Sequence, residues 1–347
     1  MKKIGMIGFF NYGLQDIGGG VMKTRNYDTM VKREYGENNV DCLDRQEGRN
    51  PLRYILHFLR IVCTSSSILI FPTAKMLKTF LPVLLLFKKV YHYQILYIVI
   101  GGWLPDSVKN NKKLFNLLKE VDKIYVETVE MKLLLQELDN VECIPNFSMR
   151  KRLEVAVPYV IEDNEVEFCT YSRITREKGI LDAIDAVAAV NEKAGKRVCK
   201  LTIYGQVWPD FETEFNAALT KHEDCIRYGG ILGRDEAIPT ISKCYMLLFP
   251  TYYQGEGFPG TLVESFMSGL PIIATDWKYN SEIIKEGYTG FIYTPHNQTE
   301  LIAMLEKCIN NPELVRQMRE NCIMEAKKYE PDALLKPLYA VINRNRS

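Results

Sequence analysis

The stretch FPTYYQGEGFPGTLVESFMSGLPIIATDWKYNSEIIKEGYTGFIYT, residues Phe249–Thr294, decides the fold. It begins at the end of an apolar run and continues through a loop with three glycines into a short helical segment. Gly269 and Pro271 lie just past that segment, where these residue types commonly end helices. Pro271–Thr275 is again apolar. The pattern predicts a strand–loop–helix–strand unit in which a Gly-rich loop leads into a helix.

The same stretch combines an anion-binding backbone with two carboxylates. A helix N-terminus has unpaired N–H groups and about half a positive charge, so a Gly-rich loop there lets a phosphate approach. Glu256 in the loop and Glu264 in the helix lie eight positions apart. Carboxylates beside a phosphate are repulsive unless they accept hydrogen bonds from hydroxyl groups. These features predict a nucleotide-sugar, with its sugar at Glu256, its ribose at Glu264 and its phosphates at the N–H groups of Phe258–Leu262.

The pair Glu256 and Glu264 within GEGFPGTLVESFMSGLPIIATD resembles the E-x7-E signature of the retaining GT-B glycosyltransferases of family 4. The longer match, with YYQGEGFPGT and ATDWKYNSEII, resembles members that build bacterial capsule and O-antigen repeat units. The resemblance implies an α/β protein with two Rossmann-like domains whose parallel sheets face across a cleft. It also implies retaining sugar transfer from a nucleotide-sugar to a glycan or an undecaprenyl-diphosphate-linked oligosaccharide. UDP is the favoured nucleotide, and GDP-mannose is the alternative donor.

A second motif, SRITREKGILDAIDAV, follows the predicted strand Val166–Tyr171 and resembles the R-x4-K element of that family. Arg173 offers a planar fork to two phosphate oxygens, and Lys178 offers a compact charge. The chain lacks D-x-D, the metal-binding motif of the other large glycosyltransferase fold. We therefore expect Arg173, Lys178 and the helix dipole to neutralise the leaving diphosphate, with no required metal and no other cofactor.

The N-terminal part also contains a Gly-rich segment. The strand Lys3–Phe9 leads into Gly18, Gly19 and Gly20 and a helical run. G-x-G-x-x-G is absent, and Asp41 and Asp44 lie too far along the chain for the usual acidic position, so a nicotinamide dehydrogenase is disfavoured. The resemblance implies instead that Gly19 and Gly20 touch the donor phosphate or the acceptor.

The strand Ile95–Ile100 ends in Gly101, Gly102, Trp103, Leu104 and Pro105. Because ligands of open parallel sheets bind beyond the carboxyl ends of strands, Gly102 and Trp103 are candidate acceptor contacts. Many family members carry a His near this strand end, and this chain has Gly-Gly-Trp. The departure keeps a second hypothesis open, a catalytically silent protein that binds a nucleotide-sugar or a glycan.

The predicted site therefore has three groups of residues. The catalytic group is Arg173, Lys178 and Glu256. The donor-binding group is Gly19, Gly20, Gly205, Gly230, Ile231, Gly257, Phe258, Pro259, Gly260, Thr261, Leu262 and Glu264. The acceptor-binding group is Gly102 and Trp103. Gly205 follows a strand and lets the chain turn beneath the nucleotide, while the resemblance places the main chain of Gly230 and Ile231 at the base.

Alternating strands and helices predict two domains. We expect an acceptor-side domain over residues 1–147 and a donor-binding domain over 164–330, joined by a mixed, charged linker. A C-terminal helix over 331–347 is expected to pack back on the first domain, as in the GT-B fold.

Composition favours a cytoplasmic protein. The chain is 47% hydrophobic and 25% charged. Its nine cysteines form no C-x-x-C pair, which favours reduced thiols and argues against a zinc site or a disulfide framework. Residues 1–113 contain 17 Lys and Arg against 8 Asp and Glu, and the remainder contains 27 against 35. Such a basic half suits an anionic membrane or a lipid diphosphate rather than nucleic acid. Residues 74–92 form an amphipathic segment whose apolar face either packs on the sheet or touches the inner face of the plasma membrane.

Overall fold

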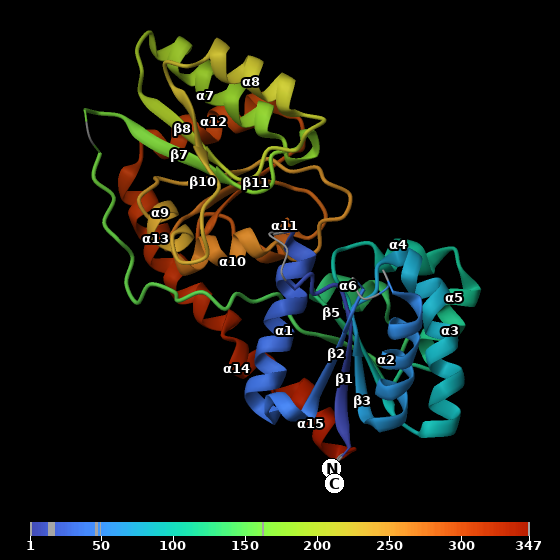
Figure 1. Ribbon diagram of the computed structural model, residues 1–347. Helices are drawn as coiled ribbons and strands as arrows, with labels where there is room; N and C mark the ends of the chain where they lie inside the picture. The colour runs from blue at the N-terminus through green and yellow to red at the C-terminus, as the bar shows by residue number, and fades with distance from the viewer. Residues whose placement is uncertain (1, 13–17, 46–47, 49, 162, 346–347) are drawn as a thin grey trace. The chain divides into compact units, whose positions relative to one another are not determined.

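The computed structural model describes residues 2–12, 18–45, 48, 50–161 and 163–345. They form two compact units. Unit 1 takes its residues from Met1–Met149, Gly255–Phe258 and Glu330–Ser347, and unit 2 from Arg150–Gln254 and Pro259–Tyr329. Each unit contains one six-stranded parallel sheet covered by helices (Figure 1). The predicted fold class, two Rossmann-like α/β units, is confirmed.

The sheet of unit 1 has the strand order β2-β1-β3-β4-β5-β6. Its strands are β1 (Lys3–Gly8), β2 (Val40–Asp44), β3 (Ser65–Ile70), β4 (Gln94–Ile98), β5 (Lys123–Val126) and β6 (Val141–Cys143). Most of their residues are buried, as is usual for parallel strands with helices on both faces, although β2 contains two aspartates and β3 begins with three serines. The chain changes direction across the sheet between β1 and β3, so the carboxyl ends of these two strands flank a topological switch point.

Helices cover both faces of this sheet. They are α1 (Gly19–Tyr35), α2 (Pro51–Thr64), α3 (Ala74–Tyr91), α4 (Leu104–Lys109), α5 (Lys112–Lys119), α6 (Val129–Leu134), α14 (Pro331–Leu334) and α15 (Lys336–Arg344). Tyr27 and Met30 of α1 share one cluster with Leu338 and Ile342 of α15. On the other side α2 packs closely on β1, because a Cβ at Gly5 would lie 2.5 Å from the side chain of Ile61.

The C-terminal segment contains two helices where the sequence suggested one. The chain turns at Leu335, between α14 and α15. Pro337 explains the break, because proline has no N–H to donate to the carbonyl four residues earlier and its ring clashes with that carbonyl. Proline is tolerated in the first turn of a helix, where it lies in α15.

The sheet of unit 2 has the order β12-β11-β10-β7-β8-β9. Its strands are β7 (Val166–Tyr171), β8 (Cys199–Tyr204), β9 (Ile226–Gly230), β10 (Leu247–Phe249), β11 (Ile272–Thr275) and β12 (Gly290–Tyr293). The predicted bounds of β7 are confirmed, whereas the short β12 was not predicted. The strand order reverses between β7 and β10, so the crevice beyond their carboxyl ends is the expected ligand position in this unit.

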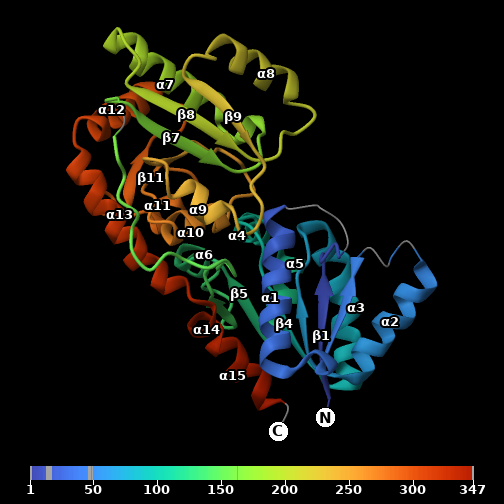
Figure 2. The ribbon, with the colours of Figure 1, turned by 60° about the vertical axis from the view of Figure 1, so that its left-hand side comes forward.

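The helices of unit 2 are α7 (Ile180–Ala194), α8 (Glu212–Lys221), α9 (Ala237–Ile241), α10 (Gly260–Met267), α11 (Asn280–Ile283), α12 (Gln298–Ile309) and α13 (Pro312–Ala326). Figures 1 and 2 show α7 and α8 on one side of the sheet and α9 and α10 on the other. The quoted stretch thus forms β10, a loop, α10 and β11, as predicted.

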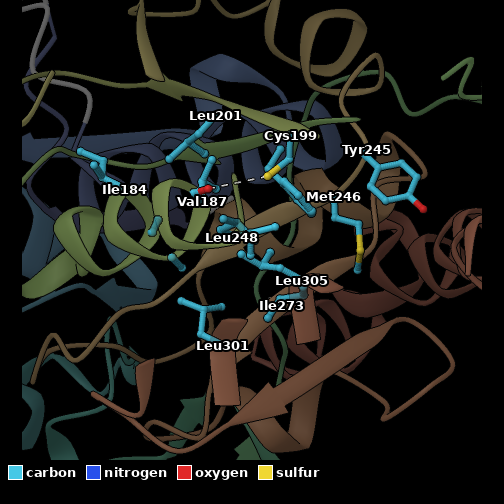
Figure 3. Packing of buried hydrophobic residues seen from close by; sticks show 14 of the residues in the cluster. Ile184, Val187, Cys199, Leu201, Tyr245, Met246, Leu248, Ile273, Leu301 and Leu305 are labelled. Carbon is cyan, nitrogen blue, oxygen red and sulfur yellow. Dashed lines mark hydrogen bonds between the residues drawn. The ribbon is translucent and has the colours of Figure 1, made fainter. Parts of the chain in front are cut away.

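The core of unit 2 is apolar and closely packed. Figure 3 shows side chains of α7, β8, β10, β11 and α12 meeting there; the labelled members include Val187, Leu201, Leu248, Ile273 and Leu305. All five are essentially inaccessible to solvent. A scaffold packed in this way holds the loops at the carboxyl ends of β7 and β10 in defined positions.

Candidate functional site

The loop after β7 carries Arg173 and Lys178 to the switch point of unit 2. Hydrogen bonds from the N–H of Ile174 to the carbonyl of Gln206 (2.8 Å) and from the N–H of Trp208 to the carbonyl of Ile174 (3.0 Å) fix this loop. Gly205 makes the close packing possible: its φ is +143°, and a Cβ there would lie 1.7 Å from the carbonyl oxygen of Ser172. Any other residue at position 205 would displace the loop that carries Arg173.

Both cations lie over one aromatic ring. The guanidinium carbon of Arg173 is 5.8 Å from the ring centre of Tyr253, and Nζ of Lys178 is 5.2 Å from it. Trp208 lies 5.7 Å from the same guanidinium, and Phe249 lies 5.4 Å from Nζ of Lys178. Within the described residues, Arg173 has no carboxylate partner. A cation held over aromatic rings keeps its charge available for an anionic ligand.

Glu264 lies in α10 and is held by Arg150. Nε of Arg150 donates to the Glu264 carboxylate at 2.8 Å, and the two side chains are largely buried. The same guanidinium donates to the carbonyls of Gly233 and Arg234 and to the hydroxyl of Tyr171. Burial and the Glu264 carboxylate raise the pKa of Tyr171, so its hydroxyl stays protonated. Arg150 therefore orients Glu264 and joins it to the loop after β9.

The N-terminus of α10 offers fewer backbone donors than the sequence suggested. The N–H of Phe258 donates to Glu127 in unit 1 at 3.1 Å, and the N–H of Leu262 donates to the carbonyl of Pro259. The first-turn residues Gly260 and Thr261 are half-buried, and the Thr261 hydroxyl donates to the carbonyl of Tyr171. The N–H groups of Phe258 and Leu262 thus already have acceptors. The predicted phosphate site is reduced to the N–H groups of Gly260 and Thr261.

Gly230 ends β9 and Ile231 follows it, beside the loop that carries Arg173. The N–H of Gly205 donates to the carbonyl of Gly230 at 2.9 Å, which ties the two strand ends together. The φ of Gly230 is +80°, a conformation that favours glycine. The side chain of Ile231 is exposed. This places both residues at the carboxyl edge of the same sheet as Arg173.

The remaining predicted residues lie in unit 1. Gly19 and Gly20 form the first turn of α1, and a Cβ at Gly20 would touch Ile100 at 3.3 Å. Nε1 of Trp103 donates to the carbonyl of Ile100 at 2.9 Å, so the indole is held at the end of β4. Glu256 and Gly257 belong to the segment 255–258, and both are buried in this unit.

Asp41 near the start of β2 and Asp44 at its end have structural partners. Asp41 accepts hydrogen bonds from His57 at 2.9 Å and from Arg60 at 2.8 Å. Burial alone would raise the pKa of Asp41, but these two hydrogen bonds outweigh it and lower the pKa. Asp44 accepts from the N–H groups of Phe10 and Tyr12, both at 3.2 Å. Both acids are therefore engaged by groups of unit 1.

Sequence reasoning missed Arg150, Trp208 and Tyr253. Tyr253 lies in the quoted stretch, but nothing local shows that its ring lies beneath two cations. Arg150 lies in the charged linker, where one arginine is not distinguishable from its neighbours. Among the described residues there is no group of His, Cys, Asp and Glu that could hold a metal ion.

Comparison with known proteins identifies the family. The model "Glycosyl transferases group 1" matches residues 153–328, about half of the chain. Among curated proteins, the chain is 26% identical over 186 residues to the alpha-D-kanosaminyltransferase of Streptomyces kanamyceticus, covering 53% of this chain and 46% of that protein. It is 25% identical over 140 residues to the amylovoran biosynthesis glycosyltransferase AmsK of Erwinia amylovora, covering 39% and 33%. The matched segments span less than half of these two relatives.

Solved structures show the same fold. The Anabaena protein Alr3699/HepE in complex with UDP superposes with a TM-score of 0.76 at 15% identity, over 99% of this chain and 100% of that one. A structure of the same protein with UDP-glucose gives a TM-score of 0.72. Together with the family match and the two parallel Rossmann-like sheets, this assigns the GT-B fold. The chain belongs to the group 1 glycosyltransferases.

Proposed function

We propose that this chain is a retaining glycosyltransferase of family 4 that moves a sugar from a UDP-sugar to a glycan or lipid-linked oligosaccharide during bacterial surface polysaccharide synthesis. The observation that carries the proposal is the pair Arg173 and Lys178 over the ring of Tyr253, at the switch point of unit 2. Two cations at this position suit the diphosphate of a nucleotide-sugar.

Each part of the donor has a proposed partner. Arg173 and Lys178 neutralise the charge that develops on the departing diphosphate, the type of electrostatic stabilisation that dominates such reactions. The N–H groups of Gly260 and Thr261 bind phosphate oxygens. Glu264, oriented by Arg150, accepts from the ribose hydroxyls. Glu256 retains the role that the sequence predicts, binding hydroxyls of the transferred sugar.

We propose that attack occurs on the face from which the nucleotide leaves. A donor phosphate oxygen then takes the proton of the acceptor hydroxyl, and no protein nucleophile is needed. The UDP and UDP-glucose complexes of the Anabaena protein favour a uridine donor. The amylovoran role in the name of the Erwinia relative favours surface polysaccharide synthesis.

The first test is a thermal-shift screen against UDP, GDP, ADP and their common sugars. A donor at 100 times its dissociation constant adds about 2.7 kcal/mol to the free energy of unfolding. We expect one nucleotide-sugar to raise the Tm of the wild type, and Arg173→Ala and Glu264→Ala to lose that shift. Arg176→Ala is the matched control, because Arg176 is an exposed arginine of the same loop that pairs with Glu214.

The outcomes separate the hypotheses. A rise in Tm in the wild type and in Arg176→Ala, but not in Arg173→Ala or Glu264→Ala, supports the donor site. A shift without release of nucleoside diphosphate on long incubation, in the presence of a glycan acceptor mixture, supports the silent binding protein. No shift with any nucleotide or nucleotide-sugar contradicts the proposed donor site.

We also propose that unit 1 contacts an anionic membrane at the cytoplasmic face of the plasma membrane. Helices α2 and α3 pack on each other through Phe58, Phe80 and Phe87, and large apolar side chains of both helices stay exposed. These are Leu52, Ile55 and Leu56 on α2 and Val83, Leu86 and Val90 on α3. Exposed cations accompany them, namely Arg53, Arg60, Lys75, Lys78 and Lys89. None of the helices in the described ranges is long and apolar enough to span a bilayer.

A surface pocket of about 460 Å³ adds to this argument. It is lined by Asn50, Leu52, Arg53, Leu56, His57 and Arg60. Apolar and cationic side chains therefore alternate on one face of α2, the composition expected of a helix that lies on an anionic membrane.

We expect the protein to bind phosphatidylserine vesicles more tightly than phosphatidylcholine vesicles at low salt, and the difference to shrink at high salt. Leu86→Ser/Val90→Ser should weaken binding at least about 10-fold, because both apolar side chains lose their burial in the lipid. The matched control is Leu133→Ser/Leu134→Ser on α6, with side chains of similar exposure (60% and 59%, against 65% and 65%). Sedimentation with vesicles measures the binding of the wild type to each lipid and the binding of the two double variants. Equal binding to the two lipids, or equal losses in the two variants, would count against this surface.

A further inference from the structure

Unit 1 contains a buried ion pair that none of the proposed steps uses. Nζ of Lys23 in α1 lies 2.5 Å from the Glu127 carboxylate, which follows β5, and each side chain is 3% exposed. Nζ of Lys23 also donates to the carbonyl of Val99 at 2.9 Å. Burying two charges is costly unless further hydrogen bonds satisfy them, so the remaining partners of the pair indicate its role.

The second oxygen of Glu127 accepts from two backbone N–H groups. These belong to Gly101, at the end of β4, and to Phe258, both at 3.1 Å. Glu127 and Phe258 are 131 residues apart in the chain. One buried carboxylate therefore joins α1, the loop after β4 and the segment 255–258.

Two other hydrogen bonds hold the segment 255–258 in the same place. The N–H of Gly102 donates to the carbonyl of Gly255 at 3.4 Å, and Nδ2 of Asn146 donates to the carbonyl of Phe258 at 3.0 Å. A Cβ at Gly257 would lie 2.0 Å from Oε2 of Glu127. Gly257 is thus needed so that the backbone can approach Glu127.

We propose that Glu127, held by Lys23, is a positioning residue that fixes the segment 255–258 so that Glu256 is set for the donor sugar. This inference rests on the proposed function. Glu256 lies between two glycines, and an unanchored segment of this kind would lose much conformational entropy on ordering. The bonds to Gly255 and Phe258 order it before the donor binds.

The experiment separates this role from that of a simple stabilising ion pair. Lys23→Met/Glu127→Gln removes both charges and keeps a carbonyl oxygen that can accept from Phe258. Lys23→Met/Glu127→Met has nearly the same shape and no such acceptor. Because both variants lose the ion pair, a purely structural role affects them alike.

The first readout is amide hydrogen exchange of the free protein, which needs no ligand. We expect peptides that contain residues 255–258 to exchange faster in the Met/Met variant than in the Met/Gln variant. Peptides from β3 and β4 in the core of the sheet should exchange equally in both. Equal exchange of the segment 255–258 in the two variants would overturn the anchor.

The second readout is kinetic and uses the nucleotide-sugar that shifts the wild type most. We expect kcat for release of nucleoside diphosphate to be about 100-fold lower in the Met/Met variant, the loss that a misplacement of about 1 Å produces. The Met/Gln variant should recover most of it, and the dissociation constant of UDP alone should be similar in both. Matching kcat values in the two variants refute the positioning role. A wild type without turnover refutes the proposed function instead, while exchange still decides on the anchor.

Discussion

Arg173→Ala and Lys178→Ala are each expected to lower kcat about 100- to 1,000-fold, the usual cost of removing one group that stabilises developing negative charge. The reason is that the diphosphate gains charge as the sugar leaves, so the two cations bind the transition state more tightly than the bound donor. Because the same cations also bind the diphosphate of the bound donor, we expect KM to rise as well, so that kcat/KM falls further than kcat. The measurement is the initial rate of nucleoside diphosphate release, with the donor found in the thermal-shift screen.

Two further variants sharpen this result. Arg173→Lys keeps the charge and loses the planar fork, so we expect a smaller loss of about 10-fold. Arg176→Ala removes a neighbouring guanidinium that is exposed and paired with Glu214, and it should leave the rate within about two-fold. If Arg173→Ala raises KM and leaves kcat unchanged, the guanidinium contributes only uniform binding, and the proposed role is wrong.

Local sequence patterns were sufficient to predict alternating strands and helices in two units, and the position of Arg173 and Lys178 directly after β7. The run Val166–Tyr171 and the following Arg173 and Lys178 are close in sequence, so the strand and the loop could be predicted together. In the strand–loop–helix–strand unit around Glu264, Gly269 and Pro271 mark the end of the helix. Short edge elements carry less signal, and the strand Gly290–Tyr293 was therefore missed.

The long-range contacts of Glu264 and of the segment 255–258 could not be predicted in this way. Arg150 reaches Glu264 across 114 positions, and Glu127 reaches Phe258 across 131. Such pairs are created by the packing of the sheet and leave no periodic pattern in the chain. For this reason the predicted phosphate site included the N–H group of Phe258, which instead donates to Glu127.

At the strand end where the resemblance leads one to expect a histidine, the chain has Gly101. Its φ is +80°, and a Cβ there would lie 2.8 Å from the carbonyl of Gly255. A side chain at this position is therefore excluded by the segment 255–258. The close packing of that segment on the end of β4 explains the first glycine of the Gly-Gly-Trp sequence, which motivated the hypothesis of a silent protein.

The largest loss of stability is expected on replacement of Arg319 in α13. The Arg319 side chain is 2% exposed. Its guanidinium donates to the carbonyls of Val157 at 3.1 Å, Cys244 at 2.8 Å and Ser242 at 2.5 Å. Burial lowers its pKa, and within the described residues it has no carboxylate partner. Arg319 therefore works as a donor to main-chain carbonyls and ties the linker at Val157 to unit 2.

Arg319→Met is expected to lower the free energy of unfolding by about 3 kcal/mol. Each buried carbonyl left without a donor costs about 1–3 kcal/mol, while removal of a buried charge returns part of that cost. Urea unfolding followed by circular dichroism measures the change. Arg316→Met on the same helix is the control, because Arg316 is exposed and pairs only with Glu313 and Glu320 among the described residues, so its loss should stay within about 0.5 kcal/mol. Equal stability of the two variants would mean that the buried charge costs as much as its hydrogen bonds contribute, and Arg319 would then fix the path of the linker without stabilising the fold.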